Sequence, residues 1–416
     1  MSLASPATSI PANLRRIRLA AGLTQEILAE KARLSRVGYV KIESGEVVPR
    51  AETLQQLAEV LGVGLLELVR PELHLGNVRF RALKKLKSRD QVLARVAGWL
   101  RDFNDLEAIL KAEVSPEDLA MLRAAGVQYA LGNVRLTRRG VEGARQAAEA
   151  AREALGVDPD APIHDICGLL ADKAGVKVFP MATASDAFFG LSVAPGGGGP
   201  AVVVNTWERI TVERWIFTVA HELGHLMLHG EEYDAAQAGE ERPEDQEEQE
   251  ANVFASYFLM PARVFEREWL ETAGLHLVDR VLKLKRIFRV SYATVLFRLA
   301  EGSPEKRGEV WKQFLGMYRR LTGRSLLKND EPPPRLSAAD FGAALPKPLA
   351  EGLPESSPRS EPERLSQADF AEDRLARLVR VAIQRELISP SRGAEILGIP
   401  LADLRERARV WIDLPA

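Results

Sequence analysis

The chain has 416 residues, more than one ordinary domain holds, so several folding units are expected. Its 46% hydrophobic and 27% charged residues are typical of a globular protein, and the net charge of -2 excludes a uniformly basic or acidic chain. A single cysteine, Cys167, excludes an intramolecular disulfide and a cysteine-rich zinc module. No segment approaches the roughly 20 apolar residues of a membrane span, and residues 1–16 lack the pattern of a signal peptide. We therefore expect a cytoplasmic protein without a membrane partner.

Residues 11–72 form the first expected unit, a series of five short helices. Thr24 and Ser35 are suited to cap two of these helices, and glycines mark helix ends. The strings L-T-Q-E-x-L-A, I-E-S-G and L-A-E-x-L-G-V resemble the XRE/Cro type of helix-turn-helix domain. The resemblance implies a phosphate contact at the start of the second helix and base reading by the helix that follows Ser35. The residues that it places on double-stranded DNA are Gln25, Ser35, Arg36, Val37 and Lys41. A small helical bundle without DNA is the alternative.

Basic residues dominate this N-terminal region. From residue 11 to residue 89, 15 Lys and Arg residues stand against 8 Asp and Glu residues, a net charge of +7. Six of the basic residues lie between Arg79 and Arg89, where they could anchor phosphates or form the solvated face of a linker helix. Residues 73–153 as a whole are expected to be a helical connector, with homodimerisation as a role left open.

The next unit, residues 154–302, opens with a helix and three short strands. The strands are expected at residues 176–179, 188–193 and 201–205, and a Pro-Gly-Gly-Gly-Gly-Pro loop joins the last two. This loop lacks the Lys-Ser/Thr ending of a phosphate-binding loop, so it is not expected to hold a nucleotide. A small sheet packed beside a helix would let a peptide add as an extra strand.

The strongest chemical signal is the pattern HExxH, formed by His221, Glu222 and His225. Apolar residues recur around it at helical spacing. Residues four apart share one face of a helix, so His221 and His225 can bind one metal ion together. Glu222 is then suited to take a proton from a water molecule. His229 continues the row, but it lies about 12 Å along the helix axis from His221, too far for the same ion. A chance match to a short pattern is the alternative.

The third metal ligand is expected in the acidic helix that follows, residues 244–261. Glu247 and Glu248 fall on or near its buried face, and Glu250 lies nearer the edge of that face. Asn252 follows Glu248 by four residues, so its amide could hold that carboxylate in place. The residues expected on the buried face are Ala251, Phe254, Ala255 and Phe258.

Here a second resemblance becomes specific. The string RITVERWIFTVAHELGHLMLHG, followed by E-x-x-A-N-x-F-A and an LMP ending, resembles the ImmA/IrrE family of zinc metallopeptidases. The resemblance implies an α+β, zincin-like domain that holds one zinc ion per chain, with manganese as the alternative in vivo. It implies Glu248 as the third ligand beside the two histidines. Members of the family cleave repressor proteins with helix-turn-helix folds. Two further side chains, His229 and Tyr257, are candidates to assist the oxyanion or to support the ligands from a second shell.

The C-terminal part of the chain changes composition after residue 327. Residues 303–327 are expected to be a helical extension, and residues 328–365 are rich in Pro, Ser and acidic residues, as in a flexible linker. Residues 366–416 regain helical periodicity and are expected to form a small tail that resembles a helix-turn-helix. Partner docking is favoured over base reading for this tail.

These units predict a multi-domain, mainly α chain with a five-helix DNA-binding domain, an α+β metallopeptidase domain with a small sheet, and a small helical tail. The first functional hypothesis is a transcriptional regulator, active in stress response, whose zinc endopeptidase domain cleaves a helix-turn-helix repressor. One alternative is a regulator that uses the peptidase-like domain as a sensor and cleaves nothing. The other is an antitoxin-type repressor.

Overall fold

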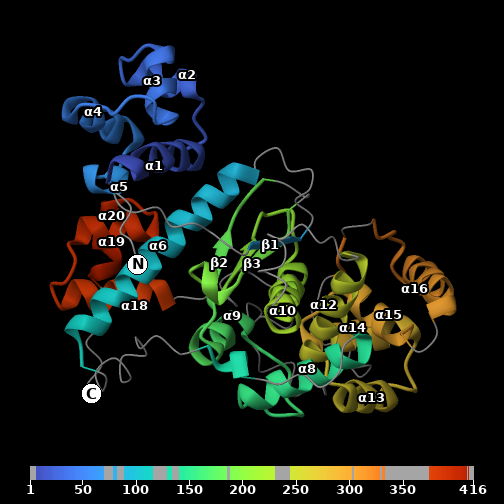
Figure 1. The fold of residues 1–416 in the computed structure, drawn as a ribbon. Coiled ribbons are helices and arrows are strands. Elements are labelled where there is room, and N and C mark those ends of the chain that lie inside the picture. The colour runs from blue at the N-terminus through green and yellow to red at the C-terminus, as the bar shows by residue number, and fades with distance from the viewer. Residues whose placement is uncertain are drawn as a thin grey trace, which may run out of the picture.

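The computed structural model describes residues 6–69, 78–81, 89–115, 129–133, 140–184, 188–229, 244–301, 304–327, 330–332, 374–409 and 411. Figure 1 shows a mainly helical, multi-domain arrangement around one small sheet, which confirms the predicted fold class. No helix among the described residues combines the length and the apolar character needed to cross a bilayer. Most of the expected linker, including residues 333–365, lies outside the described residues.

The N-terminal domain has the five predicted helices. They are α1 (Pro6–Ala20), α2 (Gln25–Lys31), α3 (Arg36–Glu43), α4 (Ala51–Leu61) and α5 (Leu65–Val69). The hydroxyl of Thr24 accepts from the backbone of Ile27 at 3.1 Å and that of Ser35 from Gly38 at 3.0 Å, so both predicted caps form. Buried apolar residues from α1 to α5, with Leu14 and Tyr39 at the centre, give this domain its own core.

The sheet has four strands in the order β1-β3-β4-β2. Their bounds are β1 (Val78–Arg81), β2 (Lys177–Met181), β3 (Gly190–Val193) and β4 (Ala201–Asn205). β2 pairs with β4 in parallel, whereas β3 pairs with β4 and β1 antiparallel. The three strands predicted between residues 176 and 205 are present. The fourth corrects an expectation: part of the basic segment 79–89, assigned to a helical connector, is the edge strand β1.

Helices cover the sheet and build the main core. α10 (Val212–Leu228) packs against β3, β4 and α12 (Glu244–Leu259), and α12 packs in turn on α8 (Gly140–Ala154). The face predicted for α12 is buried, because Ala251, Phe254, Ala255 and Phe258 are all inaccessible to solvent. The remaining helices of this domain include α9 (Ile166–Leu169), α13 (Ala262–Glu271), α14 (Leu277–Phe288), α15 (Tyr292–Leu299) and α16 (Arg307–Thr322).

A long helix, α6 (Arg89–Glu113), connects all parts of the molecule. Figure 1 shows it between the N-terminal helices, the sheet and the C-terminal helices. Its first half, with Val92, Val96 and Leu100, packs on apolar residues of the sheet. Its second half, with Phe103 and Leu106, forms a separate core with the C-terminal helices. α1 of the N-terminal domain also packs along it.

The C-terminal unit consists of α18 (Arg374–Gln384), α19 (Pro390–Leu397) and α20 (Leu401–Ala408). Ser389 caps α19, and Gly398 ends it in the left-handed conformation. α18 and α19 pack on α6, so the predicted tail is a docked module of the fold.

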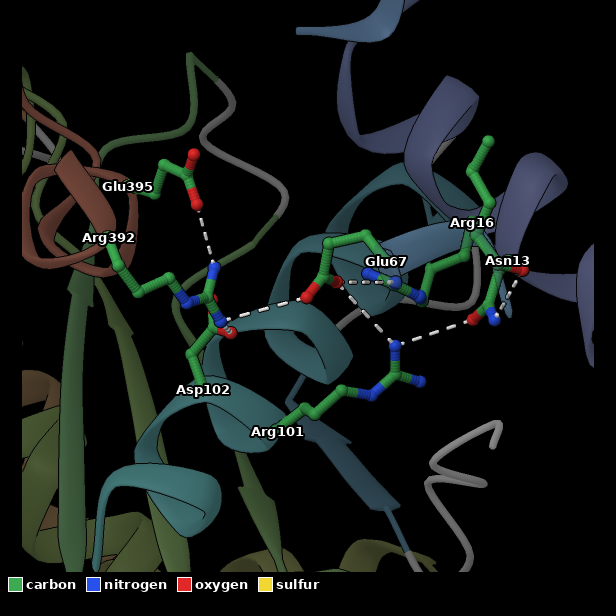
Figure 2. A network of polar contacts seen from close by, with 8 residues as sticks. Asn13, Arg16, Glu67, Arg101, Asp102, Arg392 and Glu395 are labelled. Carbon is green, nitrogen blue, oxygen red and sulfur yellow. Dashed lines mark hydrogen bonds and ion pairs between the residues drawn. The ribbon is translucent and has the colours of Figure 1, made fainter. Parts of the chain in front are cut away.

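A polar network joins three of these parts at one point. Figure 2 shows its members from α1, α5, α6 and α19: Asn13, Arg16, Glu67, Arg101, Asp102, Arg392 and Glu395. The Glu67 carboxylate lies 3.7 Å from Arg16 Nη2, 4.0 Å from Arg101 Nη1 and 3.7 Å from Arg392 Nη2. Arg392 also pairs with Asp102 on α6. A single carboxylate of the N-terminal domain thus faces guanidinium groups from its own α1, from α6 and from the C-terminal unit.

Candidate metal centre

α10 carries the two histidines of the HExxH pattern on one buried face. His221 and His225 are 0% and 1% exposed, and their Nε2 atoms lie 3.0 Å apart. The helix forms where the apolar spacing predicted it, because Trp215, Val219 and Leu223 are buried in the main core. Both ring nitrogens therefore converge on one point from adjacent turns of a rigid element.

Glu248 completes the cluster from α12. Its carboxylate lies 3.4 Å from His221 Nε2 and 3.2 Å from His225 Nε2. The two helices approach closely because α10 has a glycine at the crossing: a Cβ atom on Gly224 would lie 3.0 Å from the Phe254 ring. Among the three glutamates weighed from the sequence, Glu248 is the one in the His-His-Glu group.

The spacing of the three donor atoms suits a tetrahedral metal ion. Ligand atoms at about 2.0–2.1 Å from a tetrahedral zinc ion lie roughly 3.3 Å from one another. The observed separations of 3.0, 3.2 and 3.4 Å bracket this value. Two imidazoles and one carboxylate are also the donor set of catalytic zinc sites that keep a fourth position open. The residues present therefore fit a zinc ion.

Glu248 has the charge state that a metal ligand needs. Burial alone would raise its pKa, but hydrogen bonds to His221 and His225 and the charge of these rings hold the pKa well below its usual range. An ionised carboxylate supplies both negative charge and a lone pair to a cation.

Each ligand histidine has a polar partner at its second ring nitrogen. Asn252 Oδ1 lies 3.0 Å from His221 Nδ1, a contact that the sequence did not predict, and its expected contact with Glu248 stays a prediction. His229 Nδ1 lies 3.0 Å from His225 Nδ1, and its Nε2 lies 3.2 Å from Glu250 Oε2. If Nε2 of each ligand binds a metal, Nδ1 carries the proton and donates to these partners, which fixes the orientation of both rings.

Glu250, expected from the sequence only at the edge of the helix face, also belongs to this set. It is buried, and Gln246 donates to its other carboxylate oxygen at 3.0 Å. Its position in the sequence could have indicated this role, because it lies four residues after Gln246 and on the same helix turn as Glu248.

Glu222 lies beside the sheet. Ser192 of β3 donates from its hydroxyl to Glu222 Oε2 at 2.8 Å, and both side chains are fully buried. β3 can pass this close because of Gly190, where an added Cβ atom would lie 2.6 Å from Thr218 of α10 and 3.3 Å from Glu222 Oε1. No local pattern in the sequence marks Ser192, since it lies 30 residues before its partner.

Tyr257 is not part of the centre, which corrects its assignment as an oxyanion candidate. It follows Glu248 by nine residues, about 13 Å along the helix. Its hydroxyl donates to Glu301 at 3.2 Å, and the Arg298 guanidinium lies 3.1 Å from its ring centroid. Tyr257 therefore belongs to a polar cluster on another part of the domain.

Four of the five predicted DNA-reading residues are exposed, and Gln25 is half-buried. Arg36 and Lys41 are exposed on α3, and Val37 is 66% exposed, although large apolar side chains are normally buried. The Ser35 hydroxyl caps α3. Gln25 donates to Glu43 Oε1 at 3.0 Å, so its contact with a phosphate stays a prediction.

The fold and these sites define a DNA-binding helix-turn-helix domain joined to a metallopeptidase-like domain with a His-His-Glu cluster. Comparison with protein families agrees: residues 14–68 match the helix-turn-helix family, and residues 171–300 match the IrrE N-terminal-like domain of peptidase family M78. The predicted fusion is therefore confirmed, and the chain is a regulator with a protease-like domain. A comparison with curated proteins found no match to this chain.

Proposed function

We propose that this regulator is a zinc-dependent endopeptidase that cleaves a helix-turn-helix repressor. The observation that carries the proposal is the convergence of His221, His225 and Glu248 within 4.8 Å of one another beside a buried Glu222. A pure sensor has no need of a carboxylate at position 222.

Zinc held by these three residues would polarise the scissile carbonyl and acidify the attacking water. Glu222 accepts the proton of that water and delivers it to the leaving amine. The Ser192 hydroxyl orients Glu222 by its hydrogen bond of 2.8 Å. Asn252 and His229 keep the two imidazoles in the orientation that presents Nε2 to the metal.

Double-stranded DNA is the proposed partner of α3. The N-terminal domain supplies the affinity and brings the peptidase domain near repressors bound to the same region, which raises their local concentration. A homodimer on a two-fold operator, left open by the sequence, stays a prediction.

The proposal is tested by incubating candidate repressors with wild type and with Glu222→Gln, and identifying products by mass spectrometry. Wild type should release defined fragments, whereas Glu222→Gln should keep its metal and release none. Plasma mass spectrometry should find about one zinc per wild-type chain and a loss in His221→Ala. A zinc-loaded wild type that cleaves no repressor would favour the sensor alternative.

A further inference from the structure

We propose that β1 occupies, within the same chain, the sheet edge on which an extended peptide substrate would bind, so that the site opens only when β1 leaves. The inference rests on the proposed peptidase function for the identity of the displaced ligand. Its support is the pairing of β1 with β3 and the position of β3 beside Glu222.

β3 is the strand that borders the candidate catalytic residue. Ser192 contacts Glu222 directly, and the backbone at Gly190 is close enough that a Cβ atom there would lie 3.3 Å from Glu222 Oε1. A peptide that pairs with β3 would therefore lie along the strand that contacts Glu222. β3 is therefore the strand on which pairing would align a substrate with the site.

Both edges of β3 are already in use. β4 pairs with one edge, from Gly190↔Val204 to Val193↔Ala201. β1 pairs with the other, from Val78↔Val193 to Arg81↔Gly190, and so covers every residue of β3. Unpaired N–H and C=O groups are what make a strand edge bind a peptide. With β1 in place, a peptide cannot reach that edge of β3.

The short length of β1 and its position outside the peptidase-family segment suit a strand that can leave the sheet. It has only four residues, at the short end for a strand, and it pairs with residues more than a hundred positions away. It lies outside residues 171–300, which match the peptidase family. Eight residues separate it from the end of α5 and seven from the start of α6. β1 therefore belongs to the stretch that connects the DNA-binding domain to α6, and not to the peptidase-family segment with which it pairs.

Paired proline and alanine variants test whether β1 blocks the edge. Adjacent residues of a strand direct their N–H groups to opposite sides, so Arg79→Pro/Phe80→Pro removes whichever donor faces β3. Arg79→Ala/Phe80→Ala is the control, because it also removes both side chains but keeps the N–H groups. The probe is a fluorescent peptide with the sequence of residues 76–83, followed by anisotropy.

The proline variant should bind the probe at least about tenfold more tightly than wild type and the alanine control, because it lacks the tethered competitor. Equal affinity in all three proteins would overturn the proposal and would favour a peptide that adds to the outer edge of β1. All binding is measured in the Glu222→Gln background. If the probe binds as expected but the protein that retains Glu222 does not cleave it, the result would count against the proposed peptidase function alone.

A reversible cross-link covers the case in which the proline variant does not fold. Val78 and Val193 are direct cross-strand partners, a spacing that a disulfide can bridge. In Val78→Cys/Val193→Cys, oxidation should abolish cleavage of a repressor and reductant should restore it, while Val78→Cys alone should respond to neither. Full cleavage by the oxidised protein would show that β1 need not leave.

Discussion

The two candidate ligand histidines differ in what holds their second ring nitrogen. His221 is held by a neutral amide, that of Asn252. His225 is held by His229, which in turn contacts Glu250, so a carboxylate stands at the end of its chain of hydrogen bonds. Such a chain fixes the ring and makes the ligand nitrogen a stronger donor.

Removal of these supports should weaken metal binding without abolishing it. We expect His229→Ala and Asn252→Ala to bind zinc about 10–100-fold less tightly, measured by competition with a chelator. Tyr257→Phe is the matched control, since Tyr257 is on the same helix as Asn252 but bonded to Glu301. Unchanged affinity in His229→Ala would mean that this histidine only fills space in the core.

How far the site could be predicted depends on sequence distance. The histidine pair is local to one helix, so spacing alone predicts that His221 and His225 converge. Glu248 needed a family resemblance, because spacing left three glutamates open. The contact of Ser192 with Glu222 depends on the crossing of a strand and a helix, and a pattern of four or five residues contains no information about such a crossing.

At the scale of elements, a short segment after α16 is attached to the core through a buried lysine. Lys285 of α14 is 1% exposed and pairs with Glu213 in the first turn of α10. Its Nζ also lies 3.3 Å from Glu331, which accepts from the backbone of Tyr292 at 3.3 Å. Two carboxyl groups thus share one ammonium group. Burial raises the pKa of Glu331 to about 7, Lys285 opposes the rise and Glu213 adds to it.

This arrangement predicts a stability that depends on pH. The folded protein keeps the Glu331 proton up to about pH 7, whereas the unfolded chain loses it near the ordinary value of 4.5. The folded state binds more protons in this window, so the free energy of unfolding should fall as the pH rises through it, by roughly 3 kcal/mol at most. Urea titrations from pH 4.5 to 7.5 should show this slope in wild type and a clearly smaller slope in Glu331→Gln. The exposed Glu309→Gln should behave as wild type, and an unchanged slope in Glu331→Gln would assign the titration to another group.

α3 carries the DNA-binding prediction at this scale. In the full chain, Arg36→Ala and Lys41→Ala should each weaken binding to the operator by roughly 1–3 kcal/mol if they contact bases. Gel-shift titrations on operator and random duplexes should show loss of discrimination between the two. Equal losses on both duplexes would mark these residues as phosphate contacts instead.

Elements were predictable where their pattern is local. The caps at Thr24 and Ser35 and the apolar spacing of α10 follow from neighbouring residues. β1 does not, since Arg81 pairs with Gly190, 109 positions away, and its basic residues are equally typical of a solvated helix. Pairing with β3, and not the sequence of residues 78–81 alone, makes this segment extended.

At the scale of the whole molecule, Glu67 is the point where the DNA-binding domain, α6 and the C-terminal unit meet (Figure 2). Its side chain is 16% exposed, and it faces three guanidinium groups. Asp102 sits in the same network, where burial raises its pKa despite the charge of Arg392. The ion pairs of Glu67 with Arg101 and Arg392, and of Arg392 with Asp102, therefore form only while all three parts are docked.

Reversal of one charge should separate these parts. In Glu67→Lys, four cationic side chains would share the junction, which should destabilise the docked arrangement by roughly 2 kcal/mol. Hydrogen exchange followed by mass spectrometry should show faster exchange in α19 and α1. The control is Glu59→Lys, an exposed position on α4 of the same domain. Unchanged protection in Glu67→Lys would mean that the apolar contacts of α6 alone hold the parts together.

The position of α6 also has a consequence for synthesis on the ribosome. The apolar residues from Phe103 to Val114, in the second half of α6 and directly after it, are covered by residues that begin near Leu378, 264 positions after Val114. At a synthesis rate of about 5–20 residues per second, these apolar residues stay uncovered for roughly 13–50 s. A nascent chain therefore exposes these apolar residues throughout the time in which the peptidase domain is made. A chain truncated before residue 374 would keep these apolar residues exposed, so α18 and α19 are needed to cover them.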